Sequence, residues 1–288
     1  DFNGDGKTDF VALQNAGGGM LWHKYQTPGG YSATNFGLYN DDIPVPALFD
    51  ADFSNDIAVW RNSTGTFYVL RTADSTVEVF QFGQSGDDPI VTQDFDGDNL
   101  ADYAVVRRQN LKLVWYIALS TDGYRIQQFG NETDKPLRGD FDGDGKADLA
   151  VYRPASDSPA NTFYILRSSD SGLSVVPFGI STTDKIVPAD YDGDGKTDIA
   201  VWRETTGIWH LLRSSDGGYS AFQFGSSGDL PTPGDYDGDG KADFSVWRPN
   251  ANANESGVFH VFSQVSGYSA FGWGNSDMKI PGYILGTR

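Results

Sequence analysis

A short acidic segment leading into an apolar run occurs six times along the chain, at intervals of 45 to 50 residues. The clearest copies, at residues 140–148, 190–198 and 235–243, share the pattern Asp-x-Asp-Gly-Asp-Gly-Lys-x-Asp. A repeat of this length indicates similar units that stack on their neighbours and share one core. We therefore expect one repeat body of six units rather than one or two ordinary domains.

Each unit contains four short segments with the composition of β-strands. A Pro-containing stretch precedes the acidic loop, and two apolar runs follow it, such as residues 199–203 and 209–213. A polar turn then leads to a last run that ends in Phe-Gly, as at Phe224 and Gly225. Runs of four to six β-branched and aromatic residues bounded by Gly, Ser, Asp and Pro are typical of strands, and four of them make one propeller blade.

The number of units predicts an all-β, six-bladed β-propeller of four-stranded antiparallel blades. A seven-bladed propeller is the alternative, but it would need about 45 further residues. The segment at residues 279–283 matches the Pro-containing stretch that the first unit lacks, so we expect it to supply the missing strand of blade one. The predicted single domain has repeats at about residues 1–42, 43–88, 89–134, 135–184, 185–229 and 230–278, with a closing strand at 279–288. Because Asp1 lies inside a loop motif, we expect a processed N-terminus.

The acidic loops have the composition of calcium sites. Carboxylates at loop positions 1, 3, 5 and 9, with Gly at 4 and 6, place oxygen atoms around one small centre, and Ca²⁺ accepts six to eight such ligands. The carbonyl group of position 7 would add a backbone oxygen. Mg²⁺ fits less well because it keeps its waters, and Zn²⁺ is disfavoured by the absence of Cys and by only three His. The loop is not an EF-hand, because position 12 is a strand residue such as Val151.

We predict about five filled Ca²⁺ sites and one weak or empty site. The second loop has Leu48 at position 1 and Phe53 in place of Gly, and it keeps only Asp50, Asp52 and Asp56. The predicted ligands of the five filled sites are Asp1, Asn3, Asp5, Asp9, Asp94, Asp96, Asp98, Asp102, Asp140, Asp142, Asp144, Asp148, Asp190, Asp192, Asp194, Asp198, Asp235, Asp237, Asp239 and Asp243.

The charge of the chain restricts its partners and its location. The formal net charge is −18, and 22 of the 39 acidic residues lie in the six loops. Such a surface repels nucleic acid and anionic membranes, and five Ca²⁺ would reduce the charge to about −8. Weak oxygen-ligand sites fill where Ca²⁺ is near millimolar, so we expect an extracellular or cell-surface protein. No apolar run reaches 18 residues, so we expect no membrane insertion.

The Asp-x-Asp-x-Asp-Gly-x-x-Asp loop and the Phe-Gly pairs resemble the FG-GAP, or VCBS-type, repeats of integrin α-subunit propellers and many bacterial surface and secreted proteins. The resemblance covers essentially the whole chain. It implies that the loop lies between the first and second strands of a blade and binds Ca²⁺. Integrin propellers have seven blades, and the Phe-Gly pairs here lack a following Gly-Ala-Pro, so the chain is nearer to the bacterial variants. Family members are modules of adhesins, lectins and polysaccharide-degrading enzymes.

Recurring His and Arg residues are candidates for chemistry, but their repetition favours a structural role. His23, His210 and His260 follow an aromatic residue at the same point of the third strand, where the other units have Tyr. Arginines recur at the end of the second strand, where they are expected to pair with loop carboxylates or carbonyls, to stack on Trp or Tyr, or to form an anion-binding ring. These are Arg61, Arg107, Arg153, Arg203 and Arg248.

The sequence contains no nucleophile elbow, phosphate loop or zinc-protease motif, and no glycosidase pair of carboxylates can be distinguished from the metal loops. We therefore expect no catalytic residues. The segments that break the repeat, at residues 24–40, 154–161 and 249–256, are the expected places for recognition.

Three functions remain open. The first is a calcium-binding module for adhesion to carbohydrate, an extracellular protein or another surface polymer. The second is a structural or self-assembling surface protein. The third is a polysaccharide lyase or hydrolase on a propeller scaffold.

Overall fold

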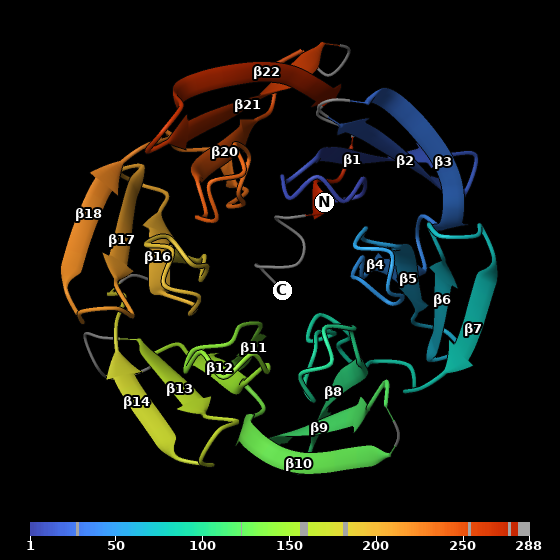
Figure 1. Cartoon of the computed structure of the whole chain (residues 1–288), viewed down its shortest axis with the longest axis vertical. Helices are drawn as coiled ribbons and strands as arrows, with labels where there is room; N and C mark the ends of the chain where they lie inside the picture. The colour runs from blue at the N-terminus through green and yellow to red at the C-terminus, as the bar shows by residue number, and fades with distance from the viewer. Residues whose placement is uncertain are drawn as a thin grey trace. The chain divides into compact units, whose positions relative to one another are not determined.

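The computed structural model describes residues 1–26, 29–121, 123–155, 161–180, 184–252, 255–275 and 278–281. Its elements in this part of the chain are β-strands, which form six antiparallel sheets (Figure 1). The predicted all-β, six-bladed β-propeller is confirmed. Contacts divide the chain into two compact units of three blades each, which are described in turn, and the predicted single domain stays a prediction.

The first unit contains blades five and six and blade one up to Asn35, with blades numbered in chain order. Blade one has β1 (Phe10–Ala16), β2 (Gly19–Gln26) and β3 (Gly30–Leu38). Blade five has β15 (Asp184–Ile186), β16 (Ile199–Arg203), β17 (Ile208–Leu212) and β18 (Tyr219–Gln223). Blade six has β19 (Leu230–Pro231), β20 (Phe244–Arg248), β21 (Ser256–Ser263) and β22 (Gly267–Asn275).

The second unit contains blades two, three and four. Blade two has β4 (Asp42–Pro44), β5 (Ile57–Arg61), β6 (Thr66–Leu70) and β7 (Val77–Gln81). Blade three has β8 (Tyr103–Gln109), β9 (Lys112–Ala118) and β10 (Tyr124–Asn131). Blade four has β11 (Lys135–Leu137), β12 (Leu149–Arg153), β13 (Thr162–Leu166) and β14 (Leu173–Pro177).

Blades one and three gain their first strand from single bridging residues. Asp88 pairs with Val106 in blade three, with both N–H···O distances at 2.8 Å. In blade one, Lys279 pairs with Leu13 through hydrogen bonds of 2.8 and 2.9 Å. The C-terminal segment therefore pairs with blade one at Lys279, whereas the closing strand over residues 279–288 stays a prediction, because residues 282–288 lie outside the described part of the chain.

Burial follows strand position within each blade. The second strand is buried on both faces, as in β16, whereas the fourth strand alternates between exposed and half-buried residues, as in β18. In blade five, Trp202 and Trp209 are fully buried, and both indole N–H groups donate to the Phe224 carbonyl, at 3.1 and 2.9 Å. Large buried aromatic residues with satisfied polar atoms contribute much of the hydrophobic stabilisation of such a blade.

The Phe-Gly pairs mark a position where a side chain does not fit. Gly225 has φ of 99°, in the left-handed region that favours glycine. A Cβ atom there would lie 3.1 Å from Val246 Cγ1 and 3.2 Å from Trp202 Cζ2. The glycine thus lets the chain leave the fourth strand while the Trp202 side chain packs against it.

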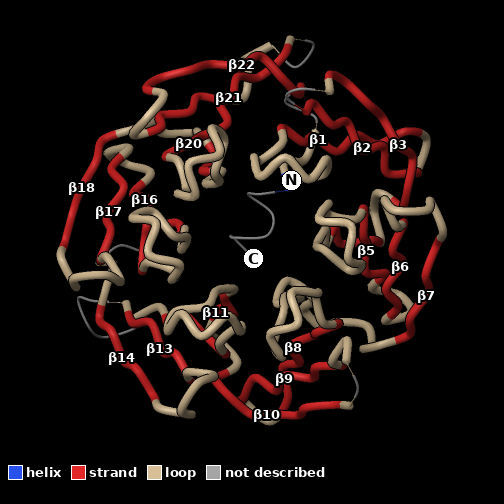
Figure 2. The backbone as a smooth tube through the Cα atoms, viewed as in Figure 1, coloured by secondary structure: helices blue, strands red, loops and turns tan. Residues whose placement is uncertain are grey.

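In blades two, four, five and six the acidic loop joins the first strand to the second, and Figure 2 draws these loops in tan beside the strands. Within a unit, the loops of consecutive blades are hydrogen-bonded to each other. In the first unit, Ala242 N donates to Asp190 O at 2.6 Å and Thr8 N donates to Asp235 O at 2.5 Å. In the second unit, Ala147 N donates to Asp94 O at 2.6 Å. Position 8 of one loop is therefore tied to position 1 of the loop before it.

Candidate functional site

Four of the acidic loops gather three carboxylates each at one point. In each group the ligand oxygens lie within 4.8 Å of one another. The groups are Asp94, Asp96 and Asp102; Asp140, Asp142 and Asp148; Asp190, Asp192 and Asp194; and Asp235, Asp237 and Asp239. The fourth carboxylate predicted for each loop, at Asp98, Asp144, Asp198 or Asp243, lies outside its group. In the described residues, the first loop, where Asn3 replaces a carboxylate, and the second loop form no such acidic group.

Positions 1 and 9 shape the loop through hydrogen bonds to the backbone. Asp140 accepts the N–H groups of Gly143 and Gly145 at 2.6 and 2.8 Å. The fully buried Asp148 accepts N–H groups from Phe141 and Ser168, both at 2.7 Å, which ties the loop to the turn after the third strand. Since each carboxylate oxygen has two lone pairs, these bonds leave acceptor capacity for a cation.

Position 3 presents buried oxygens without a hydrogen-bond partner. Asp142 Oδ1 and Asp192 Oδ1 are buried and accept no hydrogen bond from any residue that the structure describes. A buried anionic oxygen left unpaired is strongly unfavourable, so its occurrence at the same position of two loops is the arrangement that a cation ligand would have. The oxygen-only donor set and these two atoms fit Ca²⁺, which would supply the positive charge that offsets repulsion between the loop carboxylates.

The turn after the third strand orients the carboxylates at positions 3 and 5. Ser169 Oγ donates to Asp142 at 2.6 Å and Ser168 Oγ donates to Asp144 at 2.8 Å. Ser214 and Ser215 make the same bonds to Asp194 and Asp192 in blade five. The sequence prediction missed these serines, although the recurring Leu-Arg-Ser-Ser-Asp at residues 166–170 and 212–216 could have revealed them.

Burial raises the pKa of the carboxylates at position 9 in four of the loops. Desolvation raises the pKa of Asp102 and of Asp243 to about 6, and it also raises the pKa of Asp148 and of Asp198. A neighbouring divalent cation has the opposite effect, because it favours the ionised form. A bound cation would therefore stabilise the ionised form of the position 9 carboxylates.

The second loop keeps the register of the others but differs in its charges. Phe49 N donates to Asp56 Oδ2 at 2.9 Å, as at position 9 of the intact loops. Phe53 is 81% exposed and adopts φ of 66°, where the other loops have Gly or Asn. Arg71 Nη1 lies 3.9 Å from Asp50 Oδ2, so a guanidinium group faces the position 3 carboxylate. This fixed cation supports the prediction of a weak or empty second site.

The three histidines are each bonded within their own blade. His23, His210 and His260 contact the hydroxyl groups of Tyr31, Tyr219 and Tyr268 through Nδ1, at 2.8 to 2.9 Å. Burial lowers the pKa of all three imidazoles, which favours the neutral form. They therefore do not form one catalytic or metal centre.

The second-strand arginines pair with a carboxylate that the sequence prediction did not single out. Each guanidinium group donates two hydrogen bonds of 2.7 to 3.0 Å to an Asp outside the loops. Stacking on Tyr, one of the predicted alternatives, occurs in blades two, three and four at 4.1 to 4.5 Å. For these five arginines the carboxylate partner lies outside the loops, so the alternative of pairing with a loop carboxylate does not hold for them. The pairs are Arg61–Asp42, Arg107–Asp87, Arg153–Asp134, Arg203–Asp184 and Arg248–Asp229.

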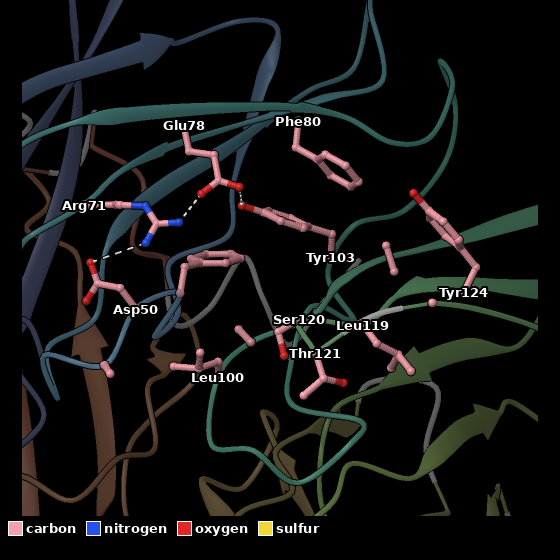
Figure 3. A pocket seen from close by; sticks show the side chains of 15 residues that line it. Asp50, Arg71, Glu78, Phe80, Leu100, Tyr103, Leu119, Ser120, Thr121 and Tyr124 are labelled. Atoms are coloured by element: carbon pink, nitrogen blue, oxygen red, sulfur yellow. Dashed lines mark hydrogen bonds and ion pairs between the residues drawn. The ribbon is translucent and has the colours of Figure 1, made fainter.

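Among the described residues, each unit has a cavity between two neighbouring blades. The larger, of about 670 Å³, is in the second unit and is lined by residues of blades two and three, including Arg71, Glu78 and Tyr124 (Figure 3). The smaller, of about 260 Å³, is in the first unit and is lined by residues that include Tyr31 and Ser256. These two residues belong to segments predicted for recognition, whereas the larger cavity was not predicted.

The fold and the acidic loops define a class of protein: a six-bladed β-propeller with candidate calcium loops between the first and second strands of its blades. Residues 140–201 and 190–246 match the family model of the FG-GAP-like repeat. Residues 140–246 of this propeller therefore contain FG-GAP-like repeats, as the resemblance implied. No curated protein matches the sequence.

Solved structures share the architecture at low sequence identity. AofleA from Arthrobotrys oligospora is 12% identical over 92% of this chain and 83% of its own, with a TM-score of 0.57. A streptogramin B lyase is 9% identical over 93% and 84% of the two chains, with a TM-score of 0.48. The first likeness supports the propeller fold, and neither bears on activity. No helix in the described residues is long and apolar enough to cross a membrane.

Replacing Asp192 by Asn is expected to remove one calcium site. The substitution keeps the size of the side chain but removes the charge next to the unpaired Oδ1 atom. At ~1 mM Ca²⁺ and a Kd of ~0.1 mM, one site contributes about 1.4 kcal/mol, so the unfolding midpoint should fall by about 3–5 °C. The difference in unfolding midpoint should disappear in EGTA, and calcium titration should count one ion fewer.

Asp216→Asn, on the exposed Arg213 pair of the same blade, is the control. An unchanged calcium count in Asp192→Asn would contradict the assignment.

Proposed function

We propose that this protein is an extracellular, calcium-stabilised β-propeller that acts as a binding or adhesion module for carbohydrate or another surface polymer. The observation that carries the proposal is the larger cavity, of about 670 Å³, on a scaffold of rigid blades. Its lining mixes aromatic, hydroxyl and charged side chains, which suits a ligand rich in hydroxyl groups. The acidic loops support the location, because weak calcium sites fill at extracellular concentrations.

The role of calcium in this proposal is structural. The carboxylate groups lie in loops that are hydrogen-bonded to the next loop within a unit, so a bound ion would stabilise the junctions between blades. The larger cavity borders one such loop, since Leu100 of the third loop lines it. Loss of calcium would therefore disturb the cavity as well as the fold.

A broad glycan array tests the proposal. We expect the protein in 1 mM CaCl₂ to bind one family of related glycans, and to lose that binding in EGTA. A blank array in calcium, repeated with the protein presented as a multivalent conjugate, would contradict the carbohydrate form of the proposal.

Self-assembly is the second candidate, and one observation favours it. The fourth strands expose apolar side chains along one face: Val77 and Val79 of β7, Ile126 of β10, and Leu173 and Val175 of β14 are all about half exposed or more. Exposed strands with β-branched residues are surfaces for pairing with another chain. An apparent molar mass that rises with protein concentration in multi-angle light scattering would support self-assembly. No specific observation favours the lyase or hydrolase alternative.

A further inference from the structure

The larger cavity lies where blade two departs from the repeat. In blades four and five, the arginine after the third strand turns outward to an Asp three residues later, as in Arg167–Asp170 and Arg213–Asp216. Arg71 has Asp74 at the same spacing, yet its guanidinium pairs with Glu78 and faces Asp50 instead. The charged groups that line this cavity are therefore held in an arrangement that blades four and five do not have.

The sequence cause of this difference is one residue of β7. Glu78 pairs in register with Val69, at the position that Ser174 and Ser220 hold in blades four and five. Ser174 accepts a hydrogen bond from Arg167 at 2.7 Å, whereas the carboxylate of Glu78 draws Arg71 into an ion pair. The other Glu78 oxygen accepts the Tyr103 hydroxyl at 2.8 Å. Figure 3 shows the resulting row of Asp50, Arg71, Glu78 and Tyr103 along one side of the cavity.

One acceptor in this row is unsatisfied. Asp50 Oδ2 is buried and has no hydrogen-bond partner among the described residues, because Arg71 is too far away at 3.9 Å to donate one. A metal would be poorly held here, since the second loop has Leu48 in place of the position 1 carboxylate. Because this atom is buried, a hydroxyl group of a ligand satisfies it only when the Asp50 side chain turns toward the cavity.

Aromatic rings supply the apolar part of the site. Tyr124 is 70% exposed at the cavity, and its ring stacks on Phe82 with centroids 6.0 Å apart. Phe80 and Tyr103 form a second aromatic pair with centroids 4.7 Å apart. An exposed aromatic ring beside fixed polar groups can cover an apolar face of a ligand while its hydroxyl groups are hydrogen-bonded.

The charged side chains that line the larger cavity disfavour the binding of an anionic ligand. Asp50 and Glu78 outnumber Arg71 in the lining, and the chain as a whole carries −18. A volume of about 670 Å³ lies within the range of roughly 300–1,000 Å³ that small-molecule sites have. The ligand class that matches these features is a neutral ring with several hydroxyl groups.

We propose that the cavity between blades two and three binds one neutral sugar unit, with Asp50 and Arg71 as its hydrogen-bonding groups and Tyr124 as its stacking surface. The inference rests on the proposed carbohydrate-binding function and assigns it to a single junction. Glu78 is a positioning residue that holds Arg71 toward the cavity.

The test compares matched variants in 1 mM CaCl₂. The probes are the array glycan that binds best and the free neutral monosaccharides that it contains, measured by isothermal titration and saturation-transfer NMR. We expect Arg71→Ala, Tyr124→Ala and Glu78→Ser to weaken binding by about tenfold or more, since each removes a charged hydrogen bond or a stacking ring. Glu78→Ser introduces the residue of blades four and five. Arg167→Ala and Tyr219→Ala, at the matching positions of those blades, should bind as the parent protein does.

The outcomes separate this inference from the proposed function. If the parent protein binds a glycan and the three cavity variants bind it equally well, the site is wrong and the function stands. If glucuronate or a sialylated glycan binds more tightly than its neutral counterpart, the neutral class is wrong. If no glycan binds the parent protein, both fail. Unchanged unfolding midpoints of the variants show that lost binding is not lost folding, and the partly exposed positions of Arg71 and Glu78 make this the expected result.

Discussion

Removing calcium with EGTA is expected to lower the unfolding midpoint of this protein by roughly 15–25 °C. At ~1 mM Ca²⁺ and a Kd of ~0.1 mM, five sites contribute roughly 7 kcal/mol, and 1 kcal/mol corresponds to about 2–4 °C for a chain of this size. The reason is electrostatic: the loops hold 22 of the 39 acidic residues and include buried carboxylate oxygens without partners. Such a change is comparable to the whole net stability of an ordinary domain.

Thermal unfolding followed by circular dichroism in 1 mM CaCl₂ and in EGTA measures this effect. Mg²⁺ at the same concentration is the control for ionic strength and for unspecific screening, and it should restore only a small part of the stability because it dehydrates reluctantly. Equal midpoints with and without calcium would show that the loops are stable as acidic turns.

Asp134→Asn is expected to lower the stability by about 3 kcal/mol, or roughly 6–12 °C in the midpoint. The Asp134 side chain is fully buried and accepts three hydrogen bonds of 2.8 Å, two from Arg153 and one from Asn131 N. The substitution leaves the Arg153 guanidinium group, whose side chain is 32% exposed, without its buried carboxylate, which is more unfavourable than losing the pair altogether.

Asp170→Asn in the same blade is the matched control for this prediction. Asp170 also makes two hydrogen bonds to an arginine, Arg167, but its side chain is 58% exposed. Water replaces the lost interaction there, so we expect no measurable change in the midpoint. Equal destabilisation by the two substitutions would contradict the conclusion that burial decides the contribution of these pairs.

The fold could be predicted because its determinants are local. The alternation of short apolar runs, the Phe-Gly pairs and the fixed spacing of the loops each depend on a few neighbouring residues, and six copies reinforce the pattern. The irregular second loop was also predictable, since Leu48 and Phe53 break rules that hold in every other copy. Phe53 indeed adopts the positive φ that its position requires.

The unpredicted features depend on side chains far apart in the sequence. The buried partner of each second-strand arginine lies 19 or 20 residues before it, and only the register of the first two strands brings the pair together. Arg71 and Arg167 have the same local context, an Asp three residues on, yet face different partners because of Glu78 and Ser174 on the neighbouring strand. Both Arg71 and Glu78 line the larger cavity, and no insertion in the sequence marks it.

The number of calcium ions bound per chain tests the central claim most directly. Equilibrium dialysis against 1 mM CaCl₂, with the metal measured by plasma mass spectrometry, should give about five ions for the parent protein, because position 1 is an acid in five loops and Leu48 in the second. A count of zero or one would contradict the claim that these loops are metal sites.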